Sequence, residues 1–73
     1  DLVVFERSKV PVLYQVCWQL DSETLDREIN GLTEAMEFFN LKEGKIITYN
    51  QADSFTIGNR IITAIPFFEW ANS

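Results

Sequence analysis

The chain lacks histidine altogether and has a single cysteine, Cys17, in 73 residues. Without histidine, the usual zinc sites and the Ser-His-Asp and Cys-His arrangements of nucleophilic catalysis are excluded within this chain. A single cysteine cannot form an internal disulfide bond. The residue types present therefore exclude several large enzyme classes.

Basic residues and long apolar runs are also scarce. Six Lys and Arg residues stand against eleven Asp and Glu residues, for a net charge of −5, opposite in sign to a surface that binds nucleic-acid phosphates. No apolar run approaches the length of a membrane span, and no signal-peptide pattern is present. We therefore expect a cytoplasmic domain that does not contact a membrane and does not bind nucleic acid by itself.

Glycine occurs only at Gly31, Gly44 and Gly58. None of these positions belongs to a Gly-Lys-Ser or Gly-Lys-Thr sequence, so the chain has no phosphate-binding P-loop.

Hydrophobic residues make up 47% of the sequence, with six Phe, two Tyr and two Trp, enough for a core in one small globular domain over residues 1–73. The chain opens on Asp1, inside a strand-like stretch and without an initiator Met. We expect it to be a domain cut from a longer sequence, with a stand-alone small binding protein as an alternative.

The stretch Val12–Leu20 is rich in β-branched and aromatic residues and has no Gly or charge, which is typical of a central strand. The two-residue period of a strand separates its side chains into two sets. One set is apolar and is predicted to face the core: Val12, Tyr14, Val16, Trp18 and Leu20. The other set contains Leu13, Gln15, Cys17 and Gln19.

The remaining elements can be arranged around this strand. Residues 2–5 predict a strand that pairs with it as a hairpin, and Asp21-Ser22 predict the start of a helix that ends near Asn40. The helix has an apolar stripe that is predicted to pack on the sheet, with its first four residues buried: Leu25, Ile29, Leu32, Met36 and Phe39. Gly31 within it marks either close approach to a strand or a tolerated defect.

A strand over Lys45–Asn50 should run parallel to the central strand, because the crossover passes through the helix. A second hairpin is predicted over Ser54–Ile57 and Arg60–Ile65, joined at Gly58-Asn59. A helical turn over Phe67–Trp70 is expected to cap the core with its aromatic side chains. The predicted fold class is α/β, a small mixed sheet with one long helix packed on it.

Three segments carry a resemblance to a known family: Gln15-Val16-Cys17-Trp18-Gln19-Leu20, Leu41-Lys42-Glu43-Gly44-Lys45-Ile46-Ile47-Thr48 and Ile65-Pro66-Phe67-Phe68-Glu69-Trp70. With them, nearly the whole chain resembles the C-terminal domain of prokaryotic AAA-type ATPases of the DUF4143 group. That domain is similar to the PD-(D/E)xK restriction-endonuclease-like fold, so the resemblance implies the second part of that fold.

The resemblance implies a degenerate nuclease motif at Asp1, Gln15 and Cys17. Asp1 occupies the position of the first acidic residue, Gln15 that of the Glu, and Cys17 that of the Lys. Gln removes a negative charge from a magnesium site, and a thiol cannot supply the cation that stabilises the phosphate. We therefore expect no catalytic residues, no metal and no cofactor.

Other interpretations of these positions are open. Gln15 and Cys17 can be sheet residues packed against a helix or loop from outside this chain, and Lys45 can supply a relocated cation. The functional prediction is a non-enzymatic interaction or regulatory module of a larger ATPase, whose partner is the rest of the parent chain or another protein, with weak homo-oligomerisation possible. The alternative is a metal-dependent DNA nuclease with an unorthodox Asp1/Gln15 site.

Overall fold

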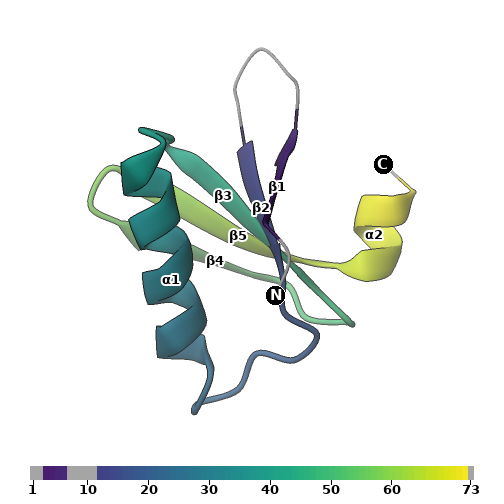
Figure 1. Ribbon diagram of the computed structural model, residues 1–73. Helices are drawn as coiled ribbons and strands as arrows, with labels where there is room; N and C mark the ends of the chain where they lie inside the picture. Colours follow the sequence, from purple (N-terminus) through teal and green to yellow (C-terminus); the bar gives the residue numbers. More distant parts are fainter. Residues whose placement is uncertain (1–2, 7–11, 73) are drawn as a thin grey trace.

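The computed structural model describes residues 3–6 and 12–72 (Figure 1). Asp1 and the predicted turn after residue 6 lie outside the described residues. The described residues form these elements in chain order: β1 (Val3–Glu6), β2 (Val12–Val16), α1 (Leu25–Phe38), β3 (Glu43–Thr48), β4 (Asp53–Ile57), β5 (Arg60–Pro66) and α2 (Phe67–Ala71).

The described strands form one mixed sheet in the order β1-β2-β3-β5-β4. The central strands β2, β3 and β5 are parallel, and an antiparallel hairpin partner lies on each side: β1 beside β2, and β4 beside β5. The predicted parallel pairing through a helical crossover is thus confirmed, as is the second hairpin, where Gly58 has the positive φ of 63° that a tight turn needs.

Helix α1 carries the predicted stripe but is shorter than predicted. It begins at Leu25, because Asp21 stabilises a non-helical turn just before that residue. The Asp21 Oδ1 accepts hydrogen bonds from the N–H groups of Glu23 (3.0 Å) and Thr24 (2.9 Å). It ends before Asn40, whose positive φ of 56° stops the helical path. Within the described residues, no helix is long and apolar enough to cross a membrane.

Three of the stripe residues, Ile29, Leu32 and Met36, are buried. Leu25 is only partly buried at the edge of the core, where it was expected to be fully covered. Phe39 lies past the helix end and is 45% exposed. The stripe prediction is therefore right for the middle of the helix and fails at its two ends.

Helix α1 covers the face of β2 opposite to the one predicted to face the core. Leu13 and Cys17 lie in the cluster beneath α1, whereas Val12 and Tyr14 form a separate small cluster with Ile47 on the opposite face. Figure 1 shows α1 alongside the sheet and α2 beyond the end of β5. Leu20 packs with the α1 cluster, because β2 ends at Val16 and the strand alternation stops there.

Gly44 marks the close approach of α1 to the sheet. A Cβ atom at this position would lie 2.8 Å from the Sδ of Met36 and 3.2 Å from Cδ2 of Leu32. Gly31, inside the helix, is exposed and has no neighbour within 4 Å of the same hypothetical atom. Of the two interpretations of Gly31, the tolerated defect is the correct one.

Candidate functional site

Gln15 turns from β2 toward α1, and its Nε2 donates a hydrogen bond to the Oε1 of Glu28. Both side chains are buried, with 7% of Gln15 and 6% of Glu28 exposed. The exposed guanidinium of Arg27 lies near the other carboxylate oxygen, with 3.8 Å between its Nε and the Oε2 of Glu28. A buried carboxylate is thus held mainly by a neutral amide.

Cys17 lies two residues after Gln15 and packs against the same cluster beneath α1. Its backbone N–H donates to the carbonyl of Ile47 at 3.0 Å, which extends the pairing of β2 with β3. Partial burial, together with the carboxylate of Glu28, raises the pKa of the Cys17 thiol. The side chain at this position is therefore uncharged at neutral pH.

As predicted, the structure brings Gln15 on β2 and Cys17, just after the end of β2, together on the side of the sheet that α1 covers. Asp1 lies outside the described residues. The expectation that a helix or loop from outside the chain covers Gln15 and Cys17 is wrong, because α1 covers them. Among residues 3–6 and 12–72, no group of three or more His, Cys, Asp or Glu side chains is placed to hold a metal ion.

Glu28 was not predicted as a site residue, although its position carried a signal. It stands three residues after Leu25 and four before Leu32, which places it on the buried side of the helix. A carboxylate at that position requires a polar partner inside the domain. The partner is Gln15, the polar residue of the adjoining strand.

Lys45 lies on the opposite side of the sheet from Gln15 and Cys17. It is paired with Tyr14 across β2 and β3, and its Nζ lies 5.8 Å from the centroid of the Tyr14 ring. Tyr14 belongs to the cluster on the face away from α1. The hypothesis that Lys45 supplies a cation beside Gln15 and Cys17 is therefore wrong.

On that opposite face, four aromatic residues form what we term the aromatic surface: Trp18, Tyr49, Phe67 and Trp70. Neighbouring rings contact one another, with centroid separations of 5.3 Å (Trp18–Tyr49), 5.9 Å (Trp18–Phe67) and 6.1 Å (Phe67–Trp70). Each remains between 42% and 59% exposed. The prediction that α2 caps the core holds for Trp70, whose ring centroid lies 6.3 Å from that of the buried Tyr14. None of the described side chains of this helix is itself buried, so the aromatic surface stays open.

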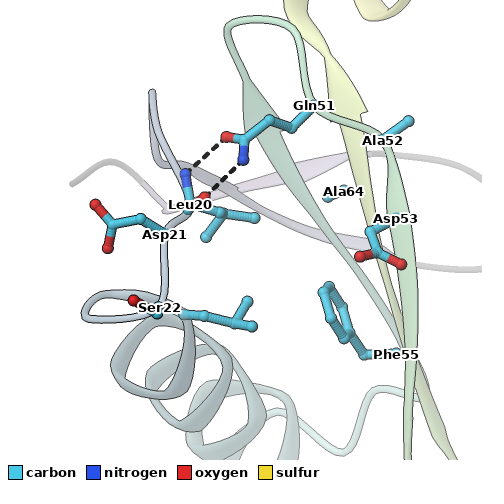
Figure 2. Close-up of a pocket in the computed structure, with 9 residues that line it drawn as sticks. Leu20, Asp21, Ser22, Gln51, Ala52, Asp53, Phe55 and Ala64 are labelled. Atoms are coloured by element: carbon cyan, nitrogen blue, oxygen red, sulfur yellow. Dashed lines mark hydrogen bonds between the residues drawn. The ribbon is translucent and has the colours of Figure 1, made fainter.

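A cleft of about 420 Å³ opens between the start of α1 and the β4–β5 hairpin. Figure 2 shows Gln51 at one end of the cleft, where its side-chain amide forms hydrogen bonds with the backbone of Leu20. The Gln51 Oε1 accepts from the Leu20 N–H at 2.7 Å, and the Gln51 Nε2 donates to the Leu20 carbonyl at 2.6 Å. This pair of bonds joins the segment after β2 to the segment after β3.

No family model matches the chain, and no solved structure matches it. Among curated proteins, the chain is similar to the uncharacterized protein MJ1544 of Methanocaldococcus jannaschii, with 31% identity over 77 aligned residues. The alignment covers 97% of the chain but 17% of that protein. The chain thus spans about a sixth of the length of the curated relative that it matches.

Proposed function

We propose that the chain is a non-catalytic, restriction-endonuclease-like module of a larger AAA-type ATPase, with an interaction or regulatory role. The observation that carries this proposal is the buried hydrogen bond between Gln15 and Glu28. It occupies the place where the resemblance puts the central carboxylate of a nuclease. The succession of hairpin, helix and parallel strand in β1, β2, α1 and β3 supports the fold part of the proposal.

A nuclease of this kind needs carboxylates that bind a hard cation and a positive charge beside the scissile phosphate. Gln15 is neutral, and the raised pKa of Cys17 keeps its thiol neutral as well. The carboxylate that contacts Gln15, that of Glu28, is covered by α1 and is 6% exposed. These properties favour a structural role for the three side chains over metal-dependent catalysis.

One observation favours the alternative, a metal-dependent nuclease that uses Asp1 and Gln15. Glu28 brings a negative charge against Gln15, so the charge missing from the strand is partly replaced from the helix. Arg27, whose Nε lies 3.8 Å from the Oε2 of Glu28, would then place a cation beside that carboxylate. A cleavage assay separates the two proposals.

The assay measures nicking of supercoiled plasmid by the purified chain in magnesium and in manganese. We expect no nicking, and we expect the backbone amides of residues 14–17 to keep their NMR positions when either metal is added. Nicking that is abolished by Asp1→Ala would establish the nuclease. The double variant Gln15→Glu/Cys17→Lys serves as a comparison, because it restores both residue types and should bind metal before it regains activity.

The aromatic surface supports the interaction role. Large exposed apolar patches on small domains commonly mark contact sites, and Trp, Tyr and Phe are enriched in such sites. We propose that the rest of the parent chain covers Trp18, Tyr49, Phe67 and Trp70, with another protein as the second possibility.

Co-purification of this chain with the separately expressed remainder of the protein tests the proposal. The double variant Trp18→Ser/Phe67→Ser should no longer co-purify. The control, Phe38→Ser, removes an aromatic ring that is 82% exposed elsewhere.

A further inference from the structure

The cleft beside β4 has an apolar floor because the core is open on this side. Helix α1 packs mainly on β2 and β3, which leaves a hollow between the start of α1 and the β4–β5 hairpin. Its floor consists of side chains from the edge of the core: Leu20, Leu25, Phe55 and Ala64. An apolar group placed in this hollow would cover apolar carbon of these side chains and would thereby be stabilised.

The charged groups of the cleft are all acidic. Figure 2 shows the carboxylate of Asp53 pointing into the hollow and that of Asp21 turned away from it. The Asp53 Oδ1 accepts a hydrogen bond from the N–H of Ser54 at 2.8 Å, which holds the carboxylate at the start of β4. None of the described residues that line the cleft is basic.

An anion would find little to bind at this end of α1. The N–H groups of Glu23 and Thr24 already donate to the Oδ1 of Asp21, and the N–H of Leu25 donates to the carbonyl of Asp21 at 2.8 Å. These three backbone donors, which lie where a helix start usually attracts anions, are thus occupied by the chain itself. The cleft combines an apolar floor with a carboxylate at its mouth.

We infer that this cleft receives a Lys or Arg side chain from a protein partner. The methylene stem of such a side chain would lie on Leu20, Leu25 and Phe55, and its charged head would reach the carboxylate of Asp53, since long basic side chains bury their stems and keep their heads in water. The net charge of −5 favours the approach of a basic partner. The cleft shares no residue with the aromatic surface, so binding at the two surfaces can be measured separately.

The test uses three small probes and the 15N-labelled chain: n-butylguanidinium as the basic side-chain analogue, 1-pentanol as its neutral counterpart and pentanoate as its anionic counterpart. We expect n-butylguanidinium to shift the amides of Leu20, Ala52 and Asp53 with the lowest dissociation constant. Pentanol should bind the same amides more weakly, and pentanoate should leave them unmoved.

The matched variants are Asp53→Asn and Asp26→Asn, which remove the same charge inside and outside the cleft. The amide introduced by Asp53→Asn keeps an oxygen that can accept from the Ser54 N–H, so the start of β4 should stay folded. Asp53→Asn should weaken n-butylguanidinium binding about twofold to fivefold, the range of an exposed ion pair, and should leave pentanol binding unchanged. Equal weakening by both variants, equal binding of pentanol and n-butylguanidinium, or the lack of any cleft shift would each overturn the inference.

Discussion

Gln15 and Glu28 join the central strand to the helix through a hydrogen bond in which both side chains are more than nine-tenths buried. The bond sits beneath α1, where most neighbours are aliphatic. A buried carboxylate in such a place depends strongly on its donor, because the cost of an unpaired buried charge exceeds the net gain from a hydrogen bond.

Removal of either partner alone should therefore destabilise the domain. We expect Gln15→Met to lower the free energy of unfolding by about 1–3 kcal/mol, because it leaves the Glu28 carboxylate without its donor. The double variant Gln15→Met/Glu28→Met should recover most of that loss, since replacing both partners by apolar groups can be nearly neutral. Urea unfolding of Gln15→Met, Glu28→Met and the double variant measures these effects, and Glu34→Met on the exposed side of α1 is the control. Additive single effects would show that the two residues are not coupled.

The thiol of Cys17 should be less reactive than an exposed cysteine. Partial burial and the Glu28 carboxylate raise its pKa above the ordinary value of 9.0, and the thiolate is the reactive form. The rate of alkylation by iodoacetamide, measured from about pH 7 to pH 10, should rise at a higher pH in the folded chain than in the urea-unfolded chain. Glu28→Gln should move the profile to lower pH, whereas Glu34→Gln should not. Identical profiles for the folded and unfolded chains would contradict the effect of burial.

Two glycine-to-alanine changes should act in opposite directions. At Gly44 the added methyl group would lie 2.8 Å from the Sδ of Met36, and overpacking of this kind costs about 1–3 kcal/mol. At Gly31 the methyl group has no neighbour within 4 Å, so the better helix propensity of Ala should add about 0.5–1 kcal/mol. Thermal or urea unfolding of both variants checks the pair. Stabilisation by Gly44→Ala would mean that α1 can shift away from β3 at little cost.

These two glycines also illustrate how far the sequence predicts the structure. The stripe of Ile29, Leu32 and Met36 predicts an amphipathic helix, and a strand on each side of that helix predicts the parallel pair. Whether a glycine is a contact point depends on which residue of β3 lies under the helix, and that follows from the register of Leu13 opposite Gly44. Strand register is a tertiary property that local patterns do not determine.

The reversal of the two faces of β2 has a similar cause. The two-residue period correctly places Tyr14 on one face of β2 and Leu13 and Gln15 on the other. Both faces carry enough apolar side chains to be covered by other parts of the domain. Composition alone therefore predicts that the helix covers the more hydrophobic face, that of Tyr14. The helix instead covers Gln15, because Glu28 on α1 supplies its hydrogen-bond partner. A charged residue on the buried stripe was thus the available signal for the correct face.

Gln51 should matter for stability although it lies in a loop. Its side-chain amide makes two hydrogen bonds with the backbone of Leu20, at 2.7 Å and 2.6 Å, and bonds of this kind contribute about 0.5–1.5 kcal/mol each. Gln51→Ala should lower the free energy of unfolding and speed hydrogen exchange at the Leu20 amide, which loses its acceptor. Asn50→Ala, one residue earlier, is the control. Unchanged exchange at Leu20 in Gln51→Ala would contradict the proposed contact.

The aromatic surface should cause weak self-association when no partner covers it. Trp18 and Tyr49 are 53% and 59% exposed, and they lie on the side of the sheet that α1 leaves open. Apolar area of this kind is commonly buried by contact with another molecule. We expect the average mass in sedimentation to rise with protein concentration, and Trp18→Ser/Phe67→Ser to reduce the rise while Phe38→Ser does not. A monomer at every concentration, with no binding of a dye for apolar surfaces, would show that Trp18, Tyr49, Phe67 and Trp70 satisfy one another within a single chain.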